Sequence, residues 1–286
     1  MAGKVANRTT ITEFLLLRLP EDWGLQVLCA TLFLLLYLAA LMGNLLLITL
    51  ITLDQHLQSP IYLFLKNLSL IDICYVSVTL PKSIMNSLTN SRSISFLGCA
   101  SQIFLVIALA GTEYALLLVM SYDCYVAICH PLHYEAIVSS HTCVQMVTVS
   151  WLSGCVYRSL HTAGTFSVHF CGSNIVHLFF CDILLLIMLA CSGQQSLEYA
   201  FIIASFCFDL MCLIFMVVSY VHIFSTVLRI PSEKGRKKTF STCLPHLAVV
   251  KLFFSSGIIA YLAPNFGSSP SVKVLTSVLY TLLPPP

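Results

Sequence analysis

Ionisable side chains inside long apolar stretches are the first feature of this sequence that could support chemistry. Such side chains are costly to place in an apolar environment, so they are usually paired or functional. Four of them interrupt apolar stretches: Asp72, Glu113, Asp209 and Lys251. Asp209 and Lys251 could pair across neighbouring segments, or each could face a water-filled cavity, and the sequence leaves both interpretations open.

Patterns typical of enzymes are weak in this chain. His130 and His133 are three residues apart, but no acidic residue lies between them and the His-Glu-x-x-His spacing of zinc proteases is missing. A Ser/His/Asp spacing typical of nucleophilic catalysis is also missing. We therefore expect both histidines to be solvated loop residues and the protein not to be an enzyme.

Cysteine is abundant, with thirteen residues. Several lie inside apolar stretches, where cysteine is usually an inert small hydrophobic residue. Four others group near one predicted end of the molecule: Cys99, Cys171, Cys181 and Cys191. Four cysteines allow three pairings, and their spacing does not select one.

The composition indicates the environment in which these residues must be positioned. Of the 286 residues, 58% are hydrophobic and 9% are charged, whereas an average soluble domain carries about 25% charged residues. So few charges cannot cover a water-facing surface, which predicts an integral membrane protein surrounded by lipid. The net charge of +2 and the lack of an aromatic–basic stripe exclude nucleic acid as a partner.

Continuous apolar runs predict membrane-spanning helices rather than a β-barrel. We expect an all-α membrane protein, a seven-transmembrane helix bundle with an N-terminal tail at 1–24 and a transmembrane domain at 25–286. The predicted spans lie near 25–51, 61–87, 97–120, 143–161, 198–228, 240–262 and 272–286. The last run is only about 22 Å long at 1.5 Å per residue. The seventh helix is therefore expected to be incomplete.

Basic residues predict the orientation of the chain in the plasma membrane. The segment 229–238 holds five basic residues and one acidic residue, so we expect it to be cytoplasmic and the N-terminus to be extracellular. A glycosylation sequon at Asn7 and a cysteine-rich loop between spans four and five agree with this orientation. No internal repeat supports a membrane transporter, which stays a minor alternative.

Several motifs then resemble one known family. The stretch MSYDCYVAICHPLHY at 120–134 is similar to the signature of vertebrate olfactory (odorant) receptors, which are rhodopsin-like class A G-protein-coupled receptors. Supporting matches are Gly43-Asn44, SPIYLFLKNLSLID at 59–72, Ser219-Tyr220 and KTFSTCLPHL at 238–247. These motifs occur in the family's order through most of the chain, so the resemblance is specific.

The resemblance implies a receptor that binds small volatile hydrophobic molecules and signals through a heterotrimeric G protein of the stimulatory olfactory type. It places the ligand between spans three, five and six, under the outer loop. The matching helical faces are apolar and suit a ligand held by burial. They comprise Ile103, Val106, Ile107, Ala110, Phe201, Ala204, Ser205, Phe208, Phe254, Gly257, Ile258 and Tyr261.

The resemblance also implies covalent and ionic features. It pairs Cys99 with Cys181 and Cys171 with Cys191. It further places Asp72 near Glu113, where two carboxylates would repel each other unless one binds a cation or keeps its proton. Two interpretations of this pair stay open: a bound sodium ion, or a protonated, hydrogen-bonded Glu113 without an ion. No other cofactor is expected.

Two departures from the family bear on signalling. The family's Asp-Arg-Tyr motif reads Asp123-Cys124-Tyr125 here, and these residues together with Tyr220 are the expected microswitch. Cysteine carries no positive charge, so Asp123 loses its expected partner and G-protein coupling is predicted to be impaired. The seventh run also ends before the family's Asn-Pro-x-x-Tyr motif. A non-signalling, truncated or pseudogene-like receptor product is therefore the main alternative.

Overall fold

A computed structural model describes most of the chain. It covers residues 12–16, 23–55, 59–89, 93–167, 196–230 and 232–262, together with six isolated positions between 176 and 191. The predicted seventh span, the sequon at Asn7 and Cys171 lie outside these described residues.

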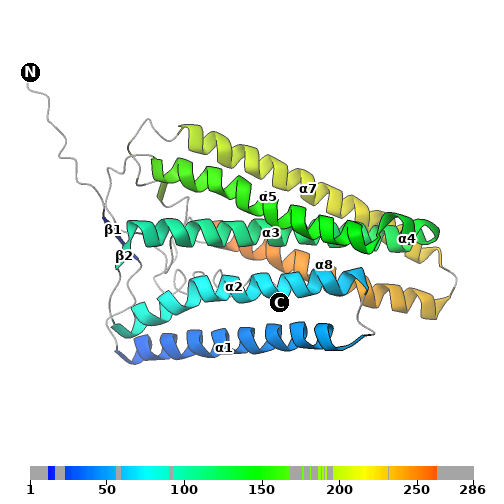
Figure 1. Cartoon of the computed structure of the whole chain (residues 1–286), viewed down its shortest axis with the longest axis horizontal. Coiled ribbons are helices and arrows are strands. Elements are labelled where there is room, and N and C mark those ends of the chain that lie inside the picture. Colours follow the sequence, from blue (N-terminus) through cyan, green and yellow to red (C-terminus); the bar gives the residue numbers. More distant parts are fainter. Residues whose placement is uncertain are drawn as a thin grey trace, which may run out of the picture.

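Long helices account for most of the described chain, because uninterrupted apolar runs satisfy their backbone hydrogen bonds internally. The long helices are α1 (Trp23–Leu53), α2 (Pro60–Thr89), α3 (Phe96–Cys129), α5 (Ser140–Ser167), α7 (Ser196–Leu228) and α8 (Glu233–Leu262). A short 3₁₀ turn (Pro131–His133) and a one-turn helix α4 (Tyr134–Ile137) connect α3 to α5. Figure 1 shows these helices side by side in an elongated bundle.

Helix α3 lies at the centre of the described bundle, where it contacts α2, α5, α7 and α8. Its side chains at Leu116, Leu117 and Met120 are buried in the main hydrophobic cluster. The outward faces are also apolar: Leu35 of α1 is 60% exposed and Phe215 of α7 is 64% exposed. Apolar side chains on both the inside and the outside of a bundle are typical of a protein whose outer surface meets lipid.

By length and apolar composition, four of the described helices are able to cross a membrane. They are α1, α2, α3 and the Tyr199–Leu228 part of α7. Helices α5 and α8, of 28 and 30 residues, are long enough to cross but less apolar.

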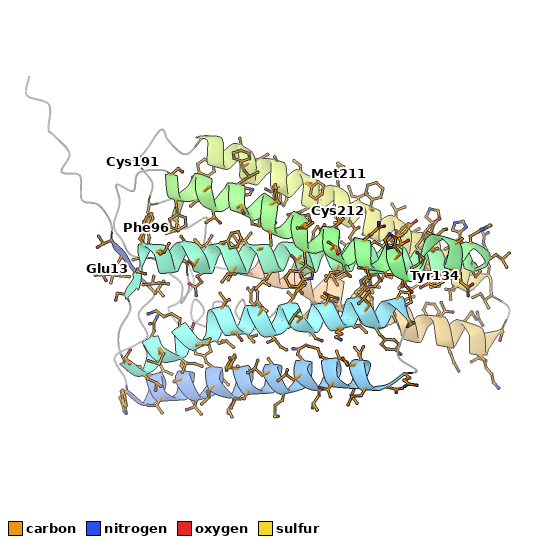
Figure 2. The ribbon with its side chains drawn as sticks, in the orientation of Figure 1. Glu13, Phe96, Tyr134, Cys191, Met211 and Cys212 are labelled. Carbon is orange, nitrogen blue, oxygen red and sulfur yellow. A yellow bond between two sulfur atoms is a disulfide. The ribbon has the colours of Figure 1, made fainter. Side chains whose placement is uncertain are left out.

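One end of the bundle carries a small two-stranded antiparallel sheet. Strand β1 (Glu13–Leu15) pairs antiparallel with β2 (Ser93–Ser95), which leads directly into α3. Ser95 caps α3, because its Oγ accepts a hydrogen bond from the Gly98 N–H at 3.1 Å. Figure 2 shows Glu13, Phe96 and Cys191 at this end and Tyr134 at the opposite one. We call the two ends the disulfide end and the α4 end.

Candidate functional site

A disulfide tethers the segment after α5 to the start of α3. Cys99 and Cys181 are bonded with their Cα atoms 5.6 Å apart, which is the pairing that the motif resemblance implies. Gln102, one turn further along α3, strengthens the tether: its Oε1 accepts from the Cys181 N–H at 3.0 Å and its Nε2 donates to the Val78 carbonyl at 3.2 Å. Gln102 was not among the predicted site residues, although a polar residue three positions after Cys99 in an apolar run is a signal. Cys191 is also disulfide-bonded.

The predicted ligand face of α3 lies under this tether. Ile103 is buried in one cluster with Cys99 and Cys181, and Ile107 packs against the same cluster. Val106 belongs instead to the main core cluster, and Ala110 is half-buried. The predicted face of α3 is therefore shared between the tethered segment and the core of the bundle.

On α8, only one of the four predicted ligand residues has a described side chain. The Phe254 ring packs edge-on against the Tyr114 ring of α3, with centroids 5.7 Å apart. Gly257, Ile258 and Tyr261 lie within α8, but their side chains are outside the described part.

The predicted ligand face of α7 lies partly against α5. Ser205 is hydrogen-bonded to Tyr157 and His161 of α5, and the Phe201 ring contacts the His161 ring at 5.8 Å. On the same side of the helix Ala204 is exposed, and Phe208 is 60% exposed. Among the described residues, Ser205 and Phe201 of this face therefore contact α5. Because α7 is apolar on all sides, its sequence does not mark an inner face, and the predicted ligand face of α7 stays a prediction.

An arginine that the sequence analysis did not consider lies beside Asp209. Arg158 of α5 interacts electrostatically with Asp209 of α7, while Lys251, the other candidate partner, is exposed. Arg158 also lies against α3, since a Cβ atom at Gly111 would be 3.3 Å from its Nε. The signal was available in the sequence, because Arg158 is a charged residue within the apolar run 143–161.

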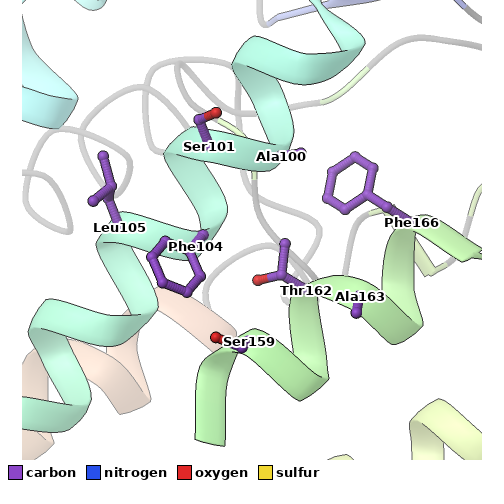
Figure 3. A pocket seen from close by; sticks show the side chains of 8 residues that line it. All are labelled: Ala100, Ser101, Phe104, Leu105, Ser159, Thr162, Ala163 and Phe166. Atoms are coloured by element: carbon purple, nitrogen blue, oxygen red, sulfur yellow. The ribbon is translucent and has the colours of Figure 1, made fainter. Parts of the chain in front are cut away.

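One cavity lies between α3 and α5, near the disulfide end. Its volume is about 570 Å³, and Figure 3 shows Phe104 and Thr162 among the side chains around it. Its lining is mainly apolar, with three hydroxyl groups from Ser101, Ser159 and Thr162. None of the twelve predicted ligand residues lines this cavity.

Two buried carboxyl groups meet between α2 and α3. Asp72 and Glu113 are both buried and close enough to interact electrostatically. The Oδ1 of Asp72 and the Oε1 of Glu113 have no hydrogen-bond partner among the described residues. A buried oxygen without a donor is costly, and a cation or a shared proton would satisfy both groups.

At the α4 end, Asp123 has a partner that the sequence analysis did not identify. The Tyr134 hydroxyl donates a hydrogen bond of 2.8 Å to the Asp123 Oδ1. Burial and this hydrogen bond raise the pKa of Tyr134, so its hydroxyl stays protonated and able to donate. Asp123 thus has no arginine at position 124, as predicted, but it accepts a hydrogen bond from Tyr134 in its place.

The remaining microswitch residues pack around the same end. Cys124 is buried in one cluster with Tyr220 of α7 and Cys243 of α8, and the Tyr220 hydroxyl is hydrogen-bonded to His246 Nδ1. Tyr125 contacts His130, whose Nε2 is 3.3 Å from the Tyr125 hydroxyl.

The two loop histidines do not form a metal site. His130 and His133 are both exposed. No group of three or more His, Cys, Asp or Glu side chains suited to a metal ion occurs among the described residues.

Comparisons with known proteins agree with the helix bundle. A family model described as olfactory receptor matches residues 33–286. Olfactory receptor 14A16 of Homo sapiens is 53% identical over 281 residues, covering 98% of this chain and 91% of the relative. Olfactory receptor 14I1 of Homo sapiens is 50% identical over 279 residues, covering 98% and 90%. The structure of squid rhodopsin superposes with a TM-score of 0.71 at 15% identity, covering 93% of this chain and 75% of that one.

Proposed function

Because this chain belongs to the olfactory receptor family, whose members are multi-pass plasma-membrane receptors and not enzymes, we propose that it binds small volatile hydrophobic molecules inside its helix bundle. The observation that carries this proposal is the tether formed by Cys99 and Cys181, which holds a segment over the apolar α3 face at Ile103 and Ile107. A small apolar ligand below this segment would be held by burial, at about 25 cal/mol per Å² of apolar surface. The predicted α8 residues would form the side of the ligand pocket opposite α3.

Ligand binding is tested by thermal stabilisation of the purified receptor with a panel of volatile hydrophobic odorants. An odorant that stabilises the wild type should bind Ile107→Ala roughly tenfold more weakly, because the variant loses buried methylene groups. Leu97→Ala is the matched control, since Leu97 lies on the same helix and is exposed. Equal losses in both variants, or no loss in Ile107→Ala, would argue against this pocket.

We also propose that the α4 end faces the cytoplasm and receives a heterotrimeric G protein of the stimulatory olfactory type. Exposed basic residues at the start of α8, including Lys234 and Lys237, support this orientation by the positive-inside rule. It leaves the disulfide end outside the cell, where disulfides persist.

Coupling to that G protein is proposed to be weak, because position 124 supplies a buried thiol in place of a cation. Odorant-dependent cyclic AMP should be low for the wild type and higher for Cys124→Arg at equal surface expression. A robust, dose-dependent response from the wild type would refute the proposed impairment without bearing on ligand binding.

The carboxyl pair of Asp72 and Glu113 is proposed to bind a sodium ion. Their unpartnered buried oxygens fit a small cation that prefers oxygen ligands. Sodium should then raise the melting temperature of the purified receptor relative to a bulky organic cation at equal ionic strength. Asp72→Asn should remove this difference, and equal melting temperatures of the wild type in both salts would favour a shared proton instead.

A further inference from the structure

Two thiols from different helices meet at the α4 end. Cys124 of α3 and Cys243 of α8 are 4% and 1% exposed and belong to one buried cluster. Their side chains are close enough to interact electrostatically, and both are free thiols. A disulfide between these neighbouring thiols would bring the two sulfurs to about 2 Å.

A small molecule can reach one member of this pair. A cavity of about 280 Å³ is lined by Cys124 together with Ser59, Ala127 and Thr239. Ser59 is exposed, so the cavity extends to the surface of the α4 end. Cys243 does not line this cavity. The two thiols are therefore inequivalent: a reagent in the cavity meets Cys124 first, with Cys243 behind it.

We propose that Cys124 and Cys243 form a redox modification site, at which hydrogen peroxide joins α3 to α8 through a reversible disulfide. The Cys124 sulfur attacks one peroxide oxygen, the O–O bond breaks, and the proton of the Cys124 thiol passes to the leaving hydroxide, which becomes water. Cys124 is then a sulfenic acid. Cys243 loses its proton and attacks this sulfur, the S–O bond breaks, and a second water leaves as the S–S bond forms. The two sulfurs lose two electrons in total and the peroxide gains two.

The disulfide would covalently fix the distance between α3 and α8 at this end. In the orientation proposed above, the site faces the cytoplasm, where dithiol reductants return two electrons and restore both thiols. Peroxide would thus hold the two helices together for as long as it is present. This inference goes beyond odorant binding, and its test needs no odorant.

The position of the cysteines in the chain allows a direct assay. Cys243 is the only cysteine after Cys212 in the sequence. A protease site inserted between α7 and α8 of the chain 1–286 therefore releases a C-terminal fragment that carries a single cysteine. Membranes are treated with hydrogen peroxide, free thiols are blocked, and the chain is cleaved and run on a non-reducing gel. We expect the two fragments to stay joined after peroxide and to separate after dithiothreitol.

Two serine variants identify the partner of Cys243. Cys124→Ser should lose the joined product. Cys129→Ser is the matched control and should keep it, because Cys129 lies on the same helix but its sulfur contacts Thr226 of α7, at 3.4 Å from the hydroxyl. Peptide mass spectrometry of the oxidised wild type gives the same information without a variant, as a linked peptide containing residues 124 and 243. Absence of a joined product in the native wild type, or a joined product that survives Cys124→Ser, overturns the proposal.

Discussion

Gly154 offers the sharpest test of how α5 packs against α3. A Cβ atom at position 154 would lie 2.8 Å from the Ala108 carbonyl oxygen and 3.2 Å from the Thr112 backbone nitrogen. Real Cβ atoms essentially never approach within 3.0 Å, and backbone atoms cannot rotate away as a side chain can. Gly154→Ala must therefore push α5 away from α3 by a few tenths of an ångström.

The expected cost follows from two opposing effects. Overpacking a tight interface costs about 1–3 kcal/mol, whereas replacing glycine by alanine inside a helix gains up to about 1 kcal/mol. Gly43→Ala is the matched control, because Gly43 also lies inside a helix and a Cβ there would have no neighbour within 4 Å. The difference between the two variants isolates the cost of the clash, about 1–3 kcal/mol.

The assay uses cysteines that become reactive when the receptor unfolds. Cys143, Cys212 and Cys243 are buried free thiols, so a thiol-reactive fluorophore reports their exposure as the purified receptor is heated. Gly154→Ala should melt below Gly43→Ala, at roughly 2–4 °C per kcal/mol on the scale for chains of 150–250 residues. A melting temperature for Gly154→Ala equal to or above that of Gly43→Ala would refute this account of the contact between α3 and α5.

Three further predictions concern single contacts. Tyr134→Phe should lower the melting temperature by the equivalent of about 1.5–3 kcal/mol, because it removes a hydrogen bond to a carboxylate, whereas Tyr122→Phe, at an exposed position of α3, should have little effect. Cys181→Ser should reduce receptor at the cell surface, since losing a native disulfide typically costs about 2–5 kcal/mol; Cys155→Ser, at an exposed free thiol, should not. Asp209→Asn should lower the melting temperature of the purified receptor, because Arg158 of α5 then loses its interaction with the Asp209 carboxylate. An unchanged melting temperature would show that the two charges are not coupled.

The sequence predicted the membrane environment, the helical class and the family well, because these depend on local properties. Apolar runs of sufficient length form helices in lipid regardless of their neighbours, and the motif at 120–134 is contiguous in the chain. The Cys99–Cys181 pair was implied by that resemblance, whereas spacing alone left three pairings open.

Only the tertiary structure decided which side chains meet across helices. A helix that faces lipid on one side and protein on the other is apolar all round, so its hydrophobic pattern does not reveal its rotation about its own axis. Only the structure shows that Ser205 of α7 contacts α5 and that Arg158, rather than the exposed Lys251, interacts with Asp209. The contact between Cys124 and Cys243 likewise joins residues more than a hundred positions apart, and it exists only because α8 packs against α3.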